Sequence, residues 1–350
     1  MAANGPEPTD VLITGAAGFI GRALTARLRA GAGLCDGHGR PFRPRRLVLC
    51  DVGLHEADSR LQDDPADDAG PVVLWRIGDI SDREFVDTLA GPGTACVFHL
   101  AGVVSGAAEA DFDLGLRVNL DGTRNLLDAL RRLSRDRSTG EDTPPVRLVH
   151  ASSIAVYGAP MPSRIDDGTQ PWPTLSYGAH KLACELLIGD MSRRGLVDGR
   201  SLRLSGVVVR PPQPNGALSA FNSDVIRETL AGRPVVSPVS PGATIWLQSV
   251  ERTVENLLHA MTLDARALGS QRSVLLPALA CRIDEIVEAV SEVAGADARR
   301  LVTYRPDARI EPMFGRWPKP FTAERGRALG FTVDADLLSL IRDFARGGSA

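Results

Sequence analysis

The chain has 350 residues, of which 43% are hydrophobic and 24% charged, the proportions of a globular protein with a large core. A net charge of −3 and a pI of about 6.1 argue against a basic binding face, so we expect no nucleic-acid partner. No apolar run approaches the roughly 18 residues of a membrane span, and the first nine residues are polar, so we expect neither a membrane partner nor a signal peptide.

The cysteines and histidines give no sign of a structural metal or of disulfides. Five cysteines are scattered along the chain without a C-x-x-C motif, at Cys35, Cys50, Cys96, Cys184 and Cys281. Such a pattern is typical of reduced thiols in a cytoplasmic protein. His99, His150 and His180 have spacings that suit no common metal site. We therefore expect a cytoplasmic protein without a metal.

A glycine-rich turn follows the first predicted strand, residues 10–14, and leads into a predicted helix. This order is typical of a dinucleotide site, where glycines let the backbone approach a pyrophosphate and helix amides face it. The glycines are Gly15, Gly18 and Gly21, in the spacing G-x-x-G-x-x-G. The sequence therefore predicts a dinucleotide cofactor, with a purely structural turn as the less favoured alternative.

The second predicted strand, residues 46–50, ends at Asp51, which indicates the choice of cofactor. An acid at this place accepts hydrogen bonds from the adenosine ribose and repels a 2′-phosphate, so we expect NAD. Residues 31–45 are rich in Gly, Pro and Arg and are predicted to be a surface loop, which places Asp51 late in the sequence. Arg45 and Arg46 precede the strand and leave NADP as an alternative.

Strands and helices alternate up to about residue 200, which predicts a parallel sheet covered by helices on both faces. Further strands are predicted at residues 72–77, 95–100 and 146–151, with a mainly helical stretch over 107–132. Ligands bind beyond the carboxyl ends of such strands. Asp79, Ala101 and Ser153 all fall at those ends, on the same edge as the glycines and Asp51.

Tyr177 and Lys181 stand one turn apart in a helix predicted over residues 176–194, so the phenol and the ammonium share a face. A free phenol loses its proton only near pH ~10, but a fixed positive charge beside it favours the phenolate. Such a pair can take a proton from an alcohol while a hydride leaves the same carbon. A Tyr and a Lys at this spacing are common on solvated helix faces. Because a predicted dinucleotide site precedes the pair in the sequence, the pair here predicts an oxidoreductase.

The C-terminal third lacks the regular alternation. Strands are predicted at 201–209, interrupted by Gly206, and at 273–276, and helices at 250–261, 283–294 and 337–345. We therefore predict an α/β fold: a Rossmann-type, doubly wound parallel sheet with a smaller mixed α/β C-terminal part. Residues 1–204 would form the dinucleotide-binding domain with the Tyr/Lys helix. Residues 205–350 would form the discontinuous, mainly substrate-binding part, with some segments returning to the sheet and a loose tail at 347–350.

Five motifs together resemble one family, the extended short-chain dehydrogenases/reductases of the NAD-dependent epimerase/dehydratase type, over essentially the whole chain. They are T-G-A-A-G-F-I-G at 14–21, G-D-I at 78–80, H-L-A-G at 99–102, S-S-I-A-V-Y-G at 152–158 and the Tyr177/Lys181 pair. The resemblance implies that Ser153 orients the reacting oxygen, Tyr177 exchanges the proton and Lys181 holds the nicotinamide ribose while favouring the phenolate.

The same resemblance implies an NAD-binding set. Asp79 and Ile80 would contact the adenine, and Asn119 would support Lys181 and a relay water. The full set is Gly15, Gly18, Phe19, Ile20, Gly21, Asp51, Asp79, Ile80, Leu100, Ala101, Gly102, Asn119, Tyr177 and Lys181. Family members often dimerise through helices that match residues 107–132 and 176–194, so a homodimer is expected.

Within that family the chain resembles the D-erythronate dehydrogenases, at 103–115, 118–123, 192–200, 207–211, 214–215 and 226–228. This implies oxidation of the C2 hydroxyl of D-erythronate to 2-oxo-D-erythronate with NAD. Ser205-Gly206 replaces an expected Pro-Thr beside the nicotinamide, and Thr229 replaces an expected Pro. A related four- or five-carbon sugar acid is therefore an alternative substrate.

A carboxylate substrate needs a cation, and the fork of an arginine suits it. Arg227 is the predicted partner and Arg210 the second candidate. Ser105, Ser152 and Ser153 are the predicted hydroxyl partners, beside Tyr177.

Three other functions are alternatives on the sequence alone. A sugar-nucleotide epimerase or reductase is the main alternative, although residues 210–215 lack the N-x-Y-G-P-like run that family epimerases commonly carry. A dehydratase would carry an acidic pair beside the catalytic hydroxyl, which Ser153-Ile154 does not provide. A non-catalytic NAD-sensing scaffold has no chemical need for Ser153, Tyr177 and Lys181 together.

Overall fold

The computed structural model describes residues 9–36, 38–54, 70–137, 144–212, 218–314 and 317–347. Pro214-Asn215 of the subfamily resemblance and the last three residues of the predicted loose tail lie outside these ranges. None of the described helices combines the length and the apolar character that crossing a bilayer requires.

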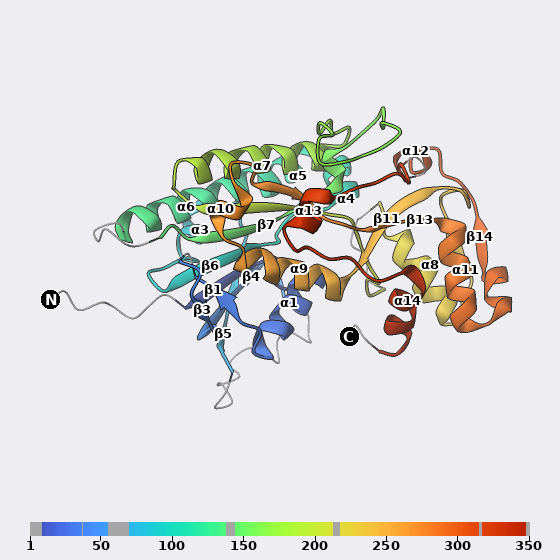
Figure 1. Ribbon diagram of the computed structural model, residues 1–350, viewed down its shortest axis with the longest axis horizontal. Helices are drawn as coiled ribbons and strands as arrows, with labels where there is room; N and C mark the ends of the chain where they lie inside the picture. The colour runs from blue at the N-terminus through green and yellow to red at the C-terminus, as the bar shows by residue number, and fades with distance from the viewer. Residues whose placement is uncertain are drawn as a thin grey trace.

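A seven-stranded, wholly parallel sheet forms the centre, in the order β12-β8-β7-β6-β1-β4-β5 (Figure 1). The strands are β1 (Asp10–Thr14), β4 (Arg46–Asp51), β5 (Val72–Ile77), β6 (Thr94–His99), β7 (Arg147–Ser153), β8 (Asp198–Leu204) and β12 (Ser273–Leu275). The order runs outward in both directions from β1, so the crevice between β1 and β6 is the place where such sheets bind ligands. The doubly wound α/β fold predicted from the sequence is confirmed.

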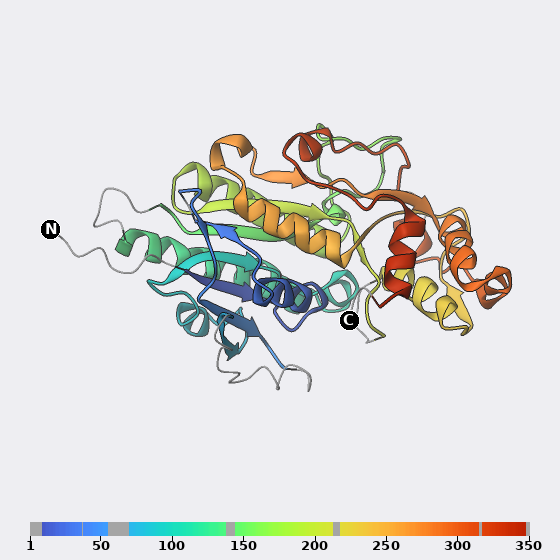
Figure 2. The ribbon, with the colours of Figure 1, turned by 60° about the horizontal axis from the view of Figure 1, so that its bottom comes forward.

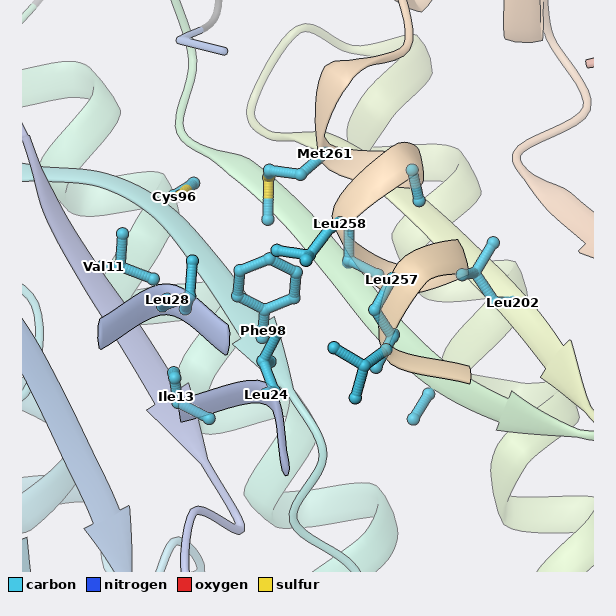
Figure 3. Close-up of a cluster of buried hydrophobic side chains, with 14 of the residues drawn as sticks. Val11, Ile13, Leu24, Leu28, Cys96, Phe98, Leu202, Leu257, Leu258 and Met261 are labelled. Atoms are coloured by element: carbon cyan, nitrogen blue, oxygen red, sulfur yellow. The ribbon is translucent and has the colours of Figure 1, made fainter. Parts of the chain in front are cut away.

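The alternation of side chains along β1 explains why both faces of the sheet are covered. Val11 and Ile13 point to one face and pack with Leu24 of α1 (Phe19–Arg29) and Leu257 of α9 (Val250–Thr262) around Phe98 (Figure 3). In Figure 2 the orange helix α9 lies across the strands on this face.

The other face of the sheet has its own core. Leu12, the residue between Val11 and Ile13, packs there with side chains of three helices. These helices are α3 (Arg83–Asp87), α6 (Gly122–Arg137) and α7 (Ser176–Arg193). A strand buried on both faces reads as a continuous apolar run, as β1 does, and the edge strand β5 also has an apolar run, so both were predicted with their observed bounds.

One predicted segment is confirmed and another needs correction. The stretch over 107–132 is mainly helical, as predicted, and consists of α4 (Ser105–Ala110), α5 (Phe112–Gly115), a π-helical turn at Leu116–Asp121 and α6. The predicted surface loop over 31–45 contains a small antiparallel pair, β2 (Leu34–Cys35) and β3 (Pro41–Phe42), in which Leu34 is buried.

The C-terminal part forms a second core at one end of the molecule, on the right in Figure 1. Its sheet is β13-β11-β9, and β10 pairs in parallel with β14 beside it. These strands are β9 (Gly206–Val208), β10 (Val235–Ser237), β11 (Thr244–Ser249), β13 (Leu279–Arg282) and β14 (Val302–Tyr304). Its main helices are α8 (Phe221–Leu230), α11 (Ile283–Ala294) and α14 (Leu337–Ala345).

Short elements complete the described chain. Two 3₁₀ turns lie at Ile154–Val156 and Ala296–Leu301, and short helices are α10 (Ala265–Leu268), α12 (Glu311–Phe314) and α13 (Glu324–Ala328).

The chain passes between the two parts without linkers. Ser205 alone separates β8 of the central sheet from β9 of the small sheet, so the strand predicted over 201–209 is in fact two strands in different sheets. β11 continues directly into α9, and β12 returns to pair with β8 at the sheet edge. Both parts therefore meet at the carboxyl end of the sheet.

Candidate active site

A cavity of about 920 Å³ follows the carboxyl ends of the central strands and extends into the C-terminal part. It brings together most of the residues predicted from the sequence: Gly15, Gly18, Phe19, Ile20, Gly21, Asp51, Asp79, Ile80, Leu100, Ala101, Gly102, Ser105, Ser152, Ser153, Tyr177 and Lys181. Asn119 and Arg227 lie beside the cavity and not in its lining.

The glycine turn packs directly against the end of β6. Gly15 has φ +73°, and a Cβ there would come within 2.6 Å of the backbone nitrogen of Ala101, so the turn can be built only from glycine. Helix α1 then begins at Phe19 without a side-chain cap. Its first amides are therefore left for an acceptor in the cavity, the arrangement that suits a pyrophosphate.

Asp51 is held against this turn. Its Oδ2 accepts a hydrogen bond from the backbone nitrogen of Ala17 at 2.9 Å, and its Oδ1 accepts one from Val52 at 2.8 Å. Arg46 begins β4 and Asp51 ends it, so Arg46 lies at the opposite end of the strand, where it pairs with Asp10, its Nε lying 3.0 Å from Asp10 Oδ2. Asp51 lines the cavity, and Arg46 does not.

Tyr177 and Lys181 come from the first two turns of α7. A Cβ at Gly178 would lie 2.0 Å from the carbonyl oxygen of Ala155, so this glycine lets the helix start tightly against the turn after Ser153. Lys181 is buried, and its Nζ lies 5.7 Å from the centre of the Tyr177 ring. Ser153 ends β7, and its Oγ accepts a hydrogen bond from Ala155 at 3.1 Å.

Asn119 holds the loop behind Lys181. Its side-chain amide accepts a hydrogen bond from the nitrogen of Val103 at 2.7 Å and donates one to the carbonyl oxygen of Val103 at 3.0 Å. A Cβ at Gly102 would lie 3.0 Å from Asn119 Oδ1 and 3.5 Å from Lys181 Nζ. Asn119 and Lys181 thus approach the same glycine, and the π-helical turn places the Asn there.

The hydroxyl of Ser152 donates a hydrogen bond to a buried carboxylate that was not predicted from the sequence. Its Oγ lies 2.6 Å from Oε1 of Glu185, and Arg203 Nη2 lies 2.7 Å from Oε2 of the same group. Arg203 also donates to the hydroxyl of Tyr157 at 2.8 Å. Glu185 stands one helical turn after Lys181, the only sequence signal that could have indicated this network.

His99 lies beneath the site as a neutral side chain. It bonds Thr14 Oγ1 at 2.7 Å and Thr123 Oγ1 at 2.9 Å, and its ring stacks on His150 with centroids 5.6 Å apart. Burial, assisted by the charge of Lys181, lowers the pKa of His99 to about 3. Among the residues that the structure describes, no group of three or more metal-ligating side chains converges.

The far end of the cavity is built by the C-terminal part. Ser205, Arg210 and Asn222 line it, together with the indoles of Trp246 and Trp317. Arg210 is the second carboxylate partner predicted from the sequence, and Ser205 is the residue that replaces an expected Pro. Asn222 and the two tryptophans carry no local motif, so the sequence alone does not place them here.

Three comparisons with known proteins agree on the kind of protein. The model of the NAD dependent epimerase/dehydratase family matches residues 11–244. The D-erythronate dehydrogenase of Cupriavidus necator is 42% identical, the match covering 96% of this chain and 97% of that one; the Haemophilus influenzae D-erythronate dehydrogenase is 33% identical, with 95% and 98% covered. The crystal structure of the nucleoside-diphosphate-sugar epimerase from Agrobacterium tumefaciens superposes with a TM-score of 0.85 at 36% identity, covering 99% and 98% of the two chains.

Proposed function

The chain belongs to the NAD-dependent epimerase/dehydratase family, and on this basis we propose that it oxidises the C2 hydroxyl of a small sugar acid, with D-erythronate as the first candidate. The observation that carries the proposal is the 42% identity to a D-erythronate dehydrogenase over nearly the whole length of both chains. The convergence of Ser153, Tyr177 and Lys181 on one cavity supplies the chemistry for such an oxidation.

The hydrogen-bond donors and acceptors of the cavity wall match the groups of NAD. The uncapped start of α1 offers amides for the pyrophosphate, Asp51 offers an acceptor for the adenosine ribose, and Lys181 offers a donor for the nicotinamide ribose. Asp79 and Ile80 line the same end of the cavity as Asp51, where we place the adenine. When bound, NAD supplies the hydride acceptor.

The residues of the chain handle the proton. Tyr177 Oη takes it from the substrate hydroxyl while the C2–H bond breaks as hydride, so the carbon becomes a carbonyl and one proton is released. Ser153 Oγ positions the reacting oxygen by a hydrogen bond, and the ammonium of Lys181 stabilises the tyrosinate. Because His99 is neutral, it adds no competing positive charge beneath Lys181.

NADH formation by the purified protein tests this function. The substrates are D-erythronate, L-erythronate, D-threonate, L-threonate and uronic acids, each with NAD and with NADP. We expect turnover of D-erythronate with NAD, and a loss of about 10²–10⁴-fold in kcat for Tyr177→Phe with NADH binding retained. An unchanged rate in Tyr177→Phe would contradict the mechanism.

A sugar-nucleotide epimerase is the second candidate, and the likeness to the Agrobacterium tumefaciens enzyme favours it. To test this candidate, UDP-glucose and UDP-galactose are added to the panel and their products are analysed. Turnover of a nucleotide sugar without any sugar acid would replace the first proposal with this one.

We also propose that the protein is a cytoplasmic homodimer. All five cysteines are free thiols, which suits a reducing compartment. Phe112 of α5 and Leu186 and Leu187 of α7 expose apolar surface on neighbouring helices, with Leu186 68% exposed. Light scattering should give a dimer for the wild type and a monomer for Leu186→Arg; a monomeric wild type would contradict the proposal.

A further inference from the structure

We propose that Arg210, Asn222 and Ser205 form a subsite that takes the carboxylate and hydroxyl groups of a short hydroxy acid, an inference that rests on the dehydrogenase function proposed above. Arg210 would bind the carboxylate directly, Asn222 and Ser205 would bind hydroxyls, and Arg227 would act only by positioning Arg210.

Two of these side chains have buried polar atoms without a partner. Ser205 is 8% and Asn222 2% exposed, and neither Ser205 Oγ nor Asn222 Oδ1 has a hydrogen-bond partner in the described part of the chain. Other unpartnered buried side-chain atoms occur in the described residues, but these two are the ones that belong to residues lining the cavity. Such atoms are unfavourable in a folded protein unless a ligand or water completes them.

Arg210 supplies a cation at the same end of the cavity. Its Nε donates to the carbonyl oxygen of Val207 at 3.2 Å, and no described carboxylate forms an ion pair with it. Burial lowers the pKa of Arg210, and the neighbouring Tyr177 partly opposes this shift. An arginine remains charged at neutral pH, so this enclosed guanidinium is suited to a carboxylate brought by the ligand.

Arg227, unlike Arg210, already has carboxylate partners among the described residues. Its guanidinium pairs with Asp224 and, through Nε at 2.9 Å, with Glu228, so its charge is already balanced. Its Nη1 donates to the carbonyl oxygen of Arg210 at 2.6 Å. The backbone nitrogen of Arg210 in turn donates to Ser223 Oγ at 3.0 Å. Side chains of helix α8 thus hold both the backbone N–H and the backbone carbonyl of Arg210, which makes Arg227 a positioning residue.

The charges of the cavity wall favour an anion at this end. The described lining carries two carboxylates: Asp51, which ends β4, and Asp79, which follows β5. Both strands lie on the other side of β1 from β7 and β8. Lys181 and Arg210 are the cations near the reacting groups. The rings of Trp246 and Trp317, with centroids 5.0 Å apart, bound this end of the cavity, which suits a short ligand.

Calorimetry on the NADH-loaded enzyme tests the subsite directly. The probes are D-glycerate, D-erythronate and D-gluconate, with erythritol as the neutral counterpart of D-erythronate. We expect at least one acid to bind and erythritol not to bind. Arg210→Ala should weaken acid binding by about 10- to 100-fold, and Arg210→Lys should recover only part of it because the fork is lost.

Two further variants distinguish a residue that contacts the acid from one that only positions Arg210. Arg227→Ala should weaken acid binding less than Arg210→Ala, because it removes only the hydrogen bond that holds the backbone of Arg210. Arg233→Ala is the matched control: Arg233 follows α8 and pairs with Glu228 on the surface, so acid binding should not change.

Ser205→Ala and Asn222→Ala add a readout that a structural role would not give. Each should weaken acid binding by about 3- to 10-fold while the melting temperature without ligand stays equal or rises, because an unpartnered polar atom is removed. A lower melting temperature with unchanged affinity would assign the two residues to the fold alone and overturn their part in the subsite.

The outcomes distinguish this inference from the proposed function. If Arg210→Ala binds acids within about twofold of the wild type while D-erythronate is still oxidised, the subsite is wrong and the function stands. If acid binding depends on Arg210 but no acid is oxidised, the subsite stands and the function fails. If the wild type binds UDP-glucose and no acid, both are wrong.

Discussion

At the scale of single residues, Asp51 combines two roles in one carboxylate, because it fixes the amide of Ala17 and carries the charge that would repel a 2′-phosphate. Asp51→Asn keeps an oxygen for the amide and removes the charge. We expect the ratio of kcat/KM for NAD over NADP to fall by about tenfold or more, measured with both cofactors at low salt.

The control for this change is Asp113→Asn, an exposed acid on α5, which should leave the ratio unaltered. If Asp51→Asn kept the full preference for NAD, the selectivity would have to come from the shape of the adenosine end of the cavity.

His99 gives the protein a defined acid sensitivity. Burial, with help from Lys181, lowers its pKa from 6.5 to about 3, so on acidification the unfolded chain gains this proton before the folded one does. Its contribution to stability is complete above about pH 6.5 and is lost as the pH falls toward 3. Between pH 6.5 and 5 we expect this residue alone to remove about 2 kcal/mol from the free energy of unfolding.

Urea unfolding at several pH values between 7 and 5 measures that slope. His99→Asn should flatten it, whereas His38→Asn, at an exposed position, should not. An equal slope in the wild type and in His99→Asn would show that other groups dominate.

At the scale of elements, the sequence could predict what is decided locally. β1, β5 and α11 have their predicted bounds because an apolar run or a 3.6-residue period extends over the whole element. The glycine turn and the Tyr177/Lys181 pair were found for the same reason, since each motif lies within one turn or helix.

The elements and site residues that could not be predicted depend on contacts between segments far apart in the sequence. Residues 201–209 look like one strand, yet Ser205 turns the chain from one sheet to another because β9 finds its partner in β11, some forty residues later. Asn222 has no motif of its own, and its place on the cavity follows from where α8 packs. β10, β11, β13 and β14 were not predicted, because such short strands depend on their neighbours more than on propensity.

A buried ion cluster joins β7, β8 and α9. Asp198 contacts Arg147 at 3.0 Å, Arg272 at 2.9 Å and Arg200. Arg147 and Arg200 also donate to carbonyl oxygens at the C-terminal end of α9, those of Met261 and Ala260. Burial raises the pKa of Asp198, but Arg200 and Arg147 outweigh it and the net shift is downward.

Asp198→Asn should therefore lower the free energy of unfolding by about 3–5 kcal/mol in urea at pH 7, because buried arginines lose their counter-charge. Asp190→Asn, which breaks exposed pairs with Arg193 and Arg194 on α7, is the control and should leave the free energy of unfolding close to that of the wild type, because exposed ion pairs are screened by solvent. Equal effects of the two variants would mean that the buried cluster is as weak as a surface pair.

At the scale of the whole molecule, we expect the two parts to depend on each other for folding, so that the chain cannot be divided at the predicted boundary, residue 204. A fragment of residues 1–204 loses β12, which leaves β8 as an open sheet edge, and loses α9, which uncovers Leu24 and Phe98. We expect this fragment to aggregate or to lack cooperative unfolding, tested by size-exclusion chromatography and circular dichroism beside the full chain. A soluble fragment with a sharp melting transition would contradict this interdependence.

The late return of β12 also bears on how the protein is made. When a ribosome has released β8, its neighbour β7 already exists, but about seventy residues must still be translated before β12, its partner on the other side, is made. At ordinary elongation rates the nascent chain presents an unprotected edge for on the order of several seconds. Because an open strand edge can pair with other chains, we expect the yield of the protein in a cell to respond to elongation speed more strongly than the stability of the finished enzyme would suggest.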